Sequence, residues 1–209
     1  MSSAGERLIR LLLETQVAED EQPDDVRSFI NQVIVYLPED DLREIGQQLV
    51  LDDEVQRAIV GTRLIRELPG HRADAAELLD RIWTAETSRD LAWWILLAFG
   101  FVPGGRAIEK IHASASDSDP AMRDAATAAI TQASGAGLSA QSRDILIRLA
   151  HDPDPEVQFS ALYEIGAWWA ETSDPQLLSE LRAAAASTDD RLARTAADAL
   201  ARGTPQGNH

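Results

Sequence analysis

One short pattern of residues returns at a fixed interval along the chain, and this period limits the possible fold more than any other feature. The clearest copy is the run 154–157, Asp-Pro-Glu-Val, which is followed by Ala161. Ala161 has counterparts at Ala126 and Ala196, so the interval is 35 residues in both directions. A fixed period of this size, with a helix start in every copy, indicates a stack of helical hairpins.

Each copy of the pattern begins with the residues that start a helix. Asp154 is the expected N-cap, because its side-chain oxygen can accept hydrogen bonds from the first amides of the helix. Pro155 follows at the first helical position, where its missing N–H costs nothing. The apolar residues after it recur every four positions and predict one apolar stripe: Val157, Ala161 and Ile165. The same order of residues returns at 119–126 and at 189–196.

Clusters of Pro, Gly and Asp divide the whole chain into pairs of helices. We expect an all-α protein, an α-α superhelix (solenoid) of about six antiparallel helical hairpins. The expected hairpins are residues 5–37, 39–68, 71–102, 105–134, 139–171 and 174–202. They are predicted to form a single solenoid domain over residues 1–202. The polar tail, residues 203–209, is expected to be disordered.

A common template fits the second helix of all six hairpins. The first stripe residues, used here as anchors, are Val26, Val55, Leu91, Met122, Val157 and Leu192. The residues four positions later are all apolar: Ile30, Ile59, Ile95, Ala126, Ala161 and Ala196. Eight positions after the anchors, Arg63 is the exception to an apolar column, and Leu64 stands next to it. The anchors are therefore expected to face the core in every hairpin.

The same template predicts which residues face away from the core. A residue two positions after an anchor points about 200° from it. These residues are Ser28, Arg57, Trp93, Asp124, Phe159 and Arg194. One turn later stand Gln32, Gly61, Leu97, Ala128, Tyr163 and Asp198. Large apolar side chains at positions that should be polar predict a protein-recognition groove with charged edges. The candidate partner-binding residues are Trp93, Leu97, Asp124, Phe159, Tyr163, Arg57 and Arg194.

A second interpretation of the aromatic residues stays open. The helix expected at 91–102 is apolar almost all round, which is typical of a helix buried on every side. Trp93 and Leu97 would then be packing residues, as Trp83, Trp94 and Trp168 are expected to be from their direction nearer the core.

The chain is strongly acidic, with a net charge of −16, and residues 1–54 hold fourteen acids against four bases. A nucleic-acid binder needs a basic surface to displace counterions from phosphate, so we expect no nucleic-acid partner. Many of the acids stand at helix starts, where they complement the helix dipole. The other interpretation is an acidic surface that attracts a basic partner.

The sequence offers no arrangement typical of a catalytic or metal site. The four histidines are scattered over different hairpins: His71, His112, His151 and His209. Asp152, Asp154 and Glu156 alternate as in a calcium loop, but prolines separate them and the turn glycine is missing, so caps explain them better. Asp124 and Glu164 could act as general acids only if buried. We therefore predict no enzymatic activity, no catalytic residues, no metal and no cofactor.

The chain has no cysteine and no apolar run long enough for a membrane span. We expect a cytoplasmic protein without a membrane partner.

The run Asp-Pro-Asp-Pro-Glu-Val at 152–157, with Ala161-Leu162 and Ile165-Gly166, resembles a HEAT repeat of the armadillo/HEAT superfamily. It is most similar to the bacterial HEAT-like type associated with phycobilisome lyases. The resemblance implies an α-α superhelix whose second helices line a concave face and bind partners there.

These observations lead to three hypotheses about function. The first is a non-enzymatic HEAT-like scaffold that binds a protein or peptide on its concave face. The second is an acidic inhibitor or immunity-type protein that blocks a basic, nucleic-acid-binding partner through the carboxylates of its first two hairpins. These are Asp24, Asp25, Glu39, Asp40, Asp41, Asp52, Asp53 and Glu54. The third is a lyase-like accessory subunit.

Overall fold

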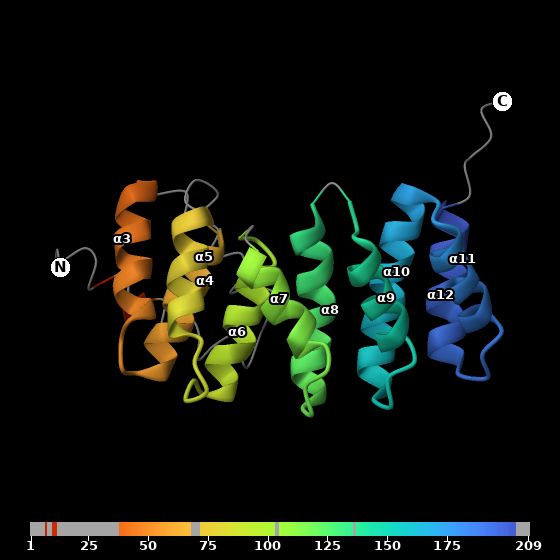
Figure 1. Ribbon diagram of the computed structural model, residues 1–209, viewed down its shortest axis with the longest axis horizontal. Coiled ribbons are helices and arrows are strands. Elements are labelled where there is room, and N and C mark those ends of the chain that lie inside the picture. Colours follow the sequence, from red (N-terminus) through yellow and green to blue (C-terminus); the bar gives the residue numbers. More distant parts are fainter. Residues whose placement is uncertain are drawn as a thin grey trace. The chain divides into compact units, whose positions relative to one another are not determined.

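The computed structural model describes residues 7, 10, 11, 38–67, 72–102, 105–135 and 137–203. These residues form ten α-helices and no β-strand, and successive helices pair as antiparallel hairpins (Figure 1). The predicted all-α fold built from helical hairpins is therefore confirmed. No helix in this described part combines the length and apolar content needed to cross a membrane. The predicted first hairpin and the tail lie outside the described residues, apart from positions 7, 10, 11 and 203.

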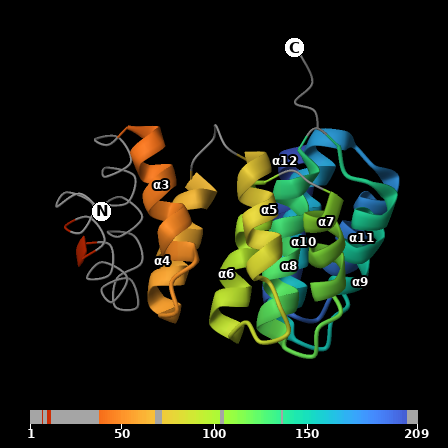
Figure 2. The same cartoon turned by 60° about the vertical axis from the view of Figure 1, so that its left-hand side comes forward.

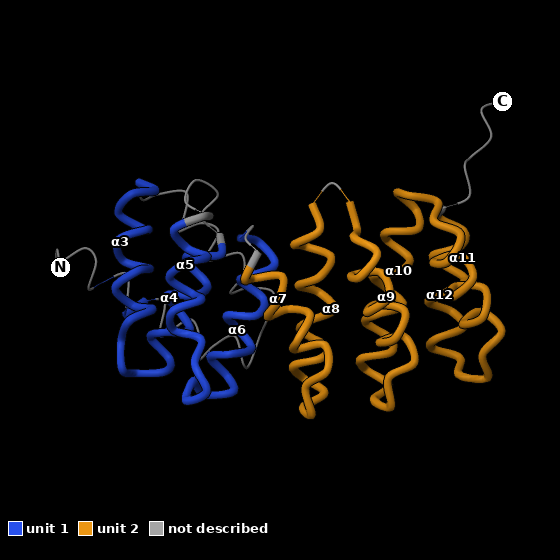
Figure 3. The backbone as a smooth tube through the Cα atoms, viewed as in Figure 1, with its two compact units in different colours: residues 1–104 blue, residues 105–209 orange. Residues whose placement is uncertain are grey.

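The chain divides into two compact units, residues 1–104 and residues 105–209 (Figure 3). Each unit has its own packed helices, and the single solenoid over residues 1–202 stays a prediction. The helices of the first unit are α3 (Glu39–Val50), α4 (Val55–Glu67), α5 (Arg72–Ile82) and α6 (Arg89–Phe99).

Unit 1 is held together by α4, which packs against both α3 and α6. Two glycines let α3 and α4 approach closely. A Cβ atom added at Gly61 would lie 2.4 Å from the backbone nitrogen of Val50 and 2.8 Å from the carbonyl oxygen of Gly46. Because these neighbours are backbone atoms, which cannot turn aside, glycine is required at this crossing.

Unit 2 repeats the hairpin three times. Its helices are α7 (Gly105–Ser114), α8 (Pro120–Ser134), α9 (Ala140–Leu149), α10 (Pro155–Thr172), α11 (Pro175–Ala185) and α12 (Asp190–Gly203). The second helices form one layer, in which α10 packs against both α8 and α12. The first helices α7, α9 and α11 form the other layer of the unit (Figure 2). We call α8, α10 and α12 the inner helices.

The inner helices of unit 2 begin with the predicted aspartate caps. Asp119, Asp154 and Asp189 each accept a hydrogen bond of 2.8–2.9 Å from the backbone N–H two residues later. In the first two, proline follows at the first helical position. One cap of this type stabilises a helix by about 1 kcal/mol. The recurrence at 35 residues therefore fixes the start of each inner helix at an equivalent point.

The core follows the predicted template closely. In the described hairpins, every residue four positions after an anchor is buried: Ile59, Ile95, Ala126, Ala161 and Ala196. The prediction for the anchor Val55 is wrong, because this side chain is 38% exposed. It stands at the first residue of α4, directly after the turn. The other described anchors are the third residues of their helices: Met122 and Val157 are buried, and Leu91 and Leu192 are half-buried.

Arg63, the exception in the apolar column, is also buried, at 9% exposure. Its guanidinium lies 4.8 Å from the ring centre of Trp94, and the neighbouring Leu64 fills the core. A cation can stack on an aromatic ring while its aliphatic stem packs with apolar groups. This arrangement explains how a charged residue occupies a core position.

Candidate protein-binding surface

The inner helices of unit 2 present six residues at the positions that the template directs away from the core. All six are half-buried or exposed: Asp124 and Ala128 on α8, Phe159 and Tyr163 on α10, and Arg194 and Asp198 on α12. We call these six residues the inner face of unit 2. Because α10 packs against both other helices, the residues of α8 and α12 flank those of α10.

Tyr163 is the most exposed aromatic residue of the described chain. Its side chain is 51% exposed, while Ala161, Leu162 and Ile165 on the same helix are buried. A large exposed apolar ring among residues that are otherwise small or charged is typical of a contact site. Tyr163 therefore marks the centre of the inner face.

Phe159, one turn before Tyr163, is covered by a residue of the next hairpin. The guanidinium of Arg191 lies 3.8 Å from the centre of the Phe159 ring. The same guanidinium donates two hydrogen bonds to the carboxylate of Glu156, at 2.5 and 2.8 Å. The hydrogen bonds from Arg191 lower the pKa of Glu156. The chain itself thus occupies one face of the Phe159 ring.

Two half-buried carboxyl groups stand on α8 and α10. Asp124 on α8 is half-buried, and among the described residues nothing donates a hydrogen bond to its Oδ1 atom, which is shielded from solvent. Glu164 on α10 is also half-buried, and burial raises its pKa, although a hydrogen bond with Thr131 of α8 acts in the opposite direction. Neither side chain is fully buried, so the burial expected of a general acid is met only in part.

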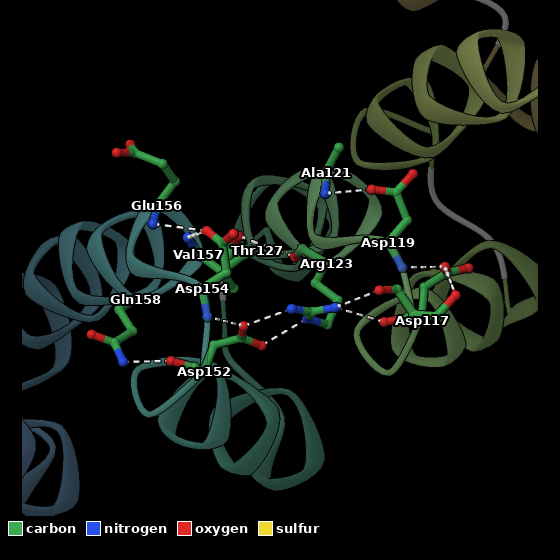
Figure 4. A network of polar contacts seen from close by, with 11 residues as sticks. Asp117, Asp119, Ala121, Arg123, Thr127, Asp152, Asp154, Glu156, Val157 and Gln158 are labelled. Carbon is green, nitrogen blue, oxygen red and sulfur yellow. Dashed lines mark hydrogen bonds and ion pairs between the residues drawn. The ribbon is translucent and has the colours of Figure 1, made fainter.

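A network of polar contacts joins the turns before α8 and α10 (Figure 4). Arg123 donates two hydrogen bonds of 2.7 Å to the carboxylate of Asp152 and one of 2.9 Å to the carbonyl oxygen of Asp117. The Asp152 side chain also accepts a hydrogen bond from the backbone N–H of Asp154. The bonds from Arg123 lower the pKa of Asp152. Arg123 and Asp152 thus neutralise each other. As the sequence indicated, these carboxylates serve as caps and turn residues.

The candidates in unit 1 come from α4 and α6, which pack together. Arg57 forms ion pairs with Asp52 at 3.1 Å and Glu54 at 3.2 Å. Trp93 is half-buried, and its ring meets that of Trp94 edge-on, with ring centres 4.9 Å apart. Leu97 is half-buried as well.

Both interpretations of α6 describe part of it. Five of its residues are buried: Ala92, Ile95, Leu96, Ala98 and Phe99. Trp93, Trp94 and Leu97 keep part of their surface exposed. The other expected packing residues differ in degree, since Trp168 is buried and Trp83 is half-buried, with its ring 5.8 Å from that of Phe99.

The structure thus brings the candidates together in two sets. Asp124, Phe159, Tyr163 and Arg194 lie on consecutive inner helices of unit 2, and Arg57, Trp93 and Leu97 lie on packed helices of unit 1. Sequence reasoning missed Arg191. The signal was present, because Glu156 and Arg191 are one repeat of 35 residues apart and so meet on adjacent inner helices.

The histidines that the structure describes do not form a metal site. No group of three or more His, Cys, Asp or Glu side chains converges in the described part of the chain. His112 contacts Ser142 at 3.0 Å, and burial lowers the pKa of His112. His151 contacts Glu180 at 2.9 Å, while His71 and His209 lie outside the described residues.

Comparisons with known proteins agree with the repeat architecture. Residues 108–201 match the family model of HEAT repeats, so the HEAT-like repeat is confirmed for this part of the chain. A comparison with curated proteins finds no match. A crystal structure of an engineered protein is similar with a TM-score of 0.51, at 18% sequence identity, over 93% of this chain and 96% of that one. This second likeness concerns the fold alone.

Proposed function

We propose that the protein is a non-enzymatic HEAT-like scaffold that binds a protein or peptide partner on the exposed face of its inner helices. HEAT repeats generally mediate protein interactions, which supports this class of function. The observation that carries the proposal is Tyr163, which projects from α10 with 51% of its side chain exposed. Tyrosine is enriched at the energetic centres of protein interfaces.

The half-buried pair Trp93 and Leu97 extends the proposal to unit 1. Both side chains keep part of their surface exposed, although five residues of the same helix are fully packed. A tryptophan that is anchored on one side and open on the other can contribute contact area with little loss of conformational entropy. We propose that these two residues form a second contact region, with Arg57 at its edge.

Affinity capture tests this function directly. Tagged wild-type protein and a Tyr163→Ala variant are used to capture proteins from the source cells, with quantification by mass spectrometry. The matched control is Arg182→Ala, at an exposed position of the outer helix α11. We expect a partner that is retained by the wild type and the control and is depleted with Tyr163→Ala. Equal recovery with all three proteins would contradict the proposed face.

One observation in unit 1 favours the acidic-inhibitor hypothesis. Leu51 is 56% exposed and Val55 is 38% exposed, and the acids Asp53 and Glu54 between them are exposed as well. An apolar pair with adjacent carboxylates could contact a basic partner. However, Asp52 is engaged with Arg57.

The described acids of that hypothesis do not form one patch. Residues 39–41 stand at the first turn of α3 and residues 52–54 follow its last turn. At 1.5 Å per residue the two groups are about 16 Å apart along the helix. The remaining acids, Asp24 and Asp25, lie outside the described residues.

A double variant, Asp53→Asn with Glu54→Gln, separates the two functions. It should leave the captured partner unchanged if the inner face binds it. Loss of a basic partner from this variant, together with normal capture by Tyr163→Ala, would favour the inhibitor instead.

A further inference from the structure

We propose that the partner segment bound by the inner face of unit 2 carries a cationic side chain, arginine or lysine, which stacks on the ring of Tyr163. This inference rests on the proposed function, because it names the chemistry of the partner at that same face. Three observations support it: a stacked arginine already present on α10, the residue that replaces this arginine beside Tyr163, and the balance of charges around the ring.

The inner face already shows how it holds a cation. Arg191 of α12 stacks on Phe159 of α10 at 3.8 Å, and Glu156 accepts two hydrogen bonds from the same guanidinium. An aromatic ring and a carboxylate one turn apart on one helix thus form a platform for a guanidinium. Planar guanidinium groups suit this geometry because they can stack on a ring and donate directional hydrogen bonds at the same time.

An aromatic ring recurs one turn later on α10 without a stacked arginine, and Ser160 takes the position that corresponds to Glu156. Tyr163 stands four residues after Phe159, and the residue four after Arg191 is Thr195. Thr195 is short and uncharged, and its hydroxyl donates to the carbonyl oxygen of Arg191 at 2.9 Å. No cation–π contact joins Tyr163 to any described residue, and its side chain stays 51% exposed. A partner can therefore supply the cation that α12 supplies to Phe159.

The charges around Tyr163 favour a cation over an anion. Asp124 on α8, Glu164 on α10 and Asp198 on α12 place one carboxyl group on each inner helix. Two arginines of these helices are engaged elsewhere, since Arg123 pairs with Asp152 and Arg191 pairs with Glu156. Arg194 and Arg202 on α12 are exposed cations as well, and Arg202 donates a hydrogen bond to the carbonyl oxygen of Asp198.

Partial burial of two of these carboxyl groups strengthens the argument. The Oδ1 atom of Asp124 is shielded and receives no hydrogen bond from the described residues, and Glu164 is half-buried. A shielded carboxylate gains more from a nearby cation than one in bulk water, because less solvent screens the interaction. An acidic segment would instead meet three carboxyl groups, and their repulsion disfavours it.

The experiment uses the full chain and a pair of labelled peptides. One peptide alternates arginine and alanine, and the other replaces each arginine by citrulline, which has nearly the same shape but no charge. Fluorescence anisotropy measures the dissociation constant at about 0.15 M salt, where weak surface attraction is screened. We expect the arginine peptide to bind at least about tenfold more tightly than the citrulline peptide, a ratio that one charge-assisted contact can provide.

Substitutions then locate the bound peptide. Tyr163→Ala should raise the dissociation constant about fivefold, and Tyr163→Phe, which keeps the ring, should leave it nearly unchanged. Asp124→Asn and Glu164→Gln should each weaken binding about threefold. The matched control is Glu109→Gln, which removes one negative charge at an exposed position of the outer helix α7. Circular dichroism confirms that each variant is folded.

The possible outcomes separate the proposal of a cationic partner from the proposed scaffold function. Equal binding of the two peptides, or equal weakening by Asp124→Asn and Glu109→Gln, would overturn the cationic partner. If a cellular partner is still captured through Tyr163 in that case, the scaffold function stands without it. If capture does not depend on Tyr163 and the arginine peptide does not bind, both proposals fail.

Discussion

Arg123 on α8 and Asp152 in the turn before α10 join two successive hairpins through a pair of hydrogen bonds, each 2.7 Å long. Both side chains are largely buried, and the remaining donor of Arg123 reaches the carbonyl oxygens of Asp117 and Ser118. A single arginine therefore links the helix that carries it, the turn before that helix and the turn of the next hairpin.

Removal of this arginine should destabilise the protein strongly. Arg123→Met keeps the aliphatic stem but leaves the Asp152 carboxylate buried without a cation, which costs about 3 kcal/mol. Urea unfolding followed by circular dichroism measures the loss. The control Arg182→Met, at an exposed position of α11, should change the free energy of unfolding by less than about 0.5 kcal/mol. If Arg123→Met lowered the free energy of unfolding no more than the control does, the Arg123–Asp152 pair would make no net contribution to stability.

The same pair predicts a pH dependence. Hydrogen bonds from Arg123 lower the pKa of Asp152 in the folded protein below the unfolded value of 3.8. The stability contributed by this carboxylate is therefore complete above about pH 4 and is lost as the pH falls through the folded pKa. In Asp152→Asn this contribution is absent at every pH. The difference in unfolding free energy between wild type and variant should thus be larger at pH 7 than at pH 2.5. A difference that does not change with pH would contradict the assignment.

Glu164 should contribute a pH dependence of stability opposite in sign to that of Asp152. Burial raises the pKa of Glu164 above its ordinary value of 4.5, so the folded state binds the proton more tightly than the unfolded state does. This group therefore lowers stability at pH values above its folded pKa and ceases to do so as the pH falls toward 4.5. Glu164→Gln should be more stable than the wild type at pH 8 and nearly equal to it at pH 4. Glu171→Gln, at an exposed position of the same helix, is the control. Destabilisation by Glu164→Gln at pH 8 would mean that the hydrogen bond with Thr131 outweighs burial.

The packing of α10 on α12 depends on the absence of a side chain at Gly166. A Cβ atom there would lie 2.6 Å from the Cβ of Ala199, so Gly166→Ala should cost about 1–3 kcal/mol despite the better helix propensity of alanine. Adding Ala199→Gly removes the opposing methyl group and should recover most of this loss, apart from about 1 kcal/mol for glycine within a helix. Calorimetric melting of the two variants tests this. Failure of the second change to recover any stability would place the strain elsewhere.

Local signals predicted most of the fold. The caps Asp119, Asp154 and Asp189 act through atoms within three residues of themselves, so their helices could be read from the sequence. The apolar column at Ala126, Ala161 and Ala196 is buried as the 35-residue period requires. Helix starts and core faces depend on spacings of a few residues, and such spacings can be recognised directly in a repeated sequence.

The candidate site was less predictable because it depends on contacts between hairpins. Position relative to an anchor gave the exposure of Tyr163, but it could not show that Arg191 covers Phe159. It also gave Val55 as a core residue, although the start of α4 leaves this side chain 38% exposed. A helical template defines direction around one axis, whereas these outcomes depend on what a neighbouring helix places there.

The turns of unit 2 have a consequence for how such a chain can change in length. Asp117, Asp152 and Ser187 each accept a hydrogen bond from the backbone N–H of the cap residue two positions later, again at intervals of 35. A segment cut out between two equivalent turns would contain its own turn residue and helix cap. The two ends of the remaining chain would then join at an equivalent turn. Duplication or deletion of one such segment would therefore keep the same turn hydrogen bond and helix cap at every junction between hairpins. The chain could gain or lose a hairpin in a single genetic step.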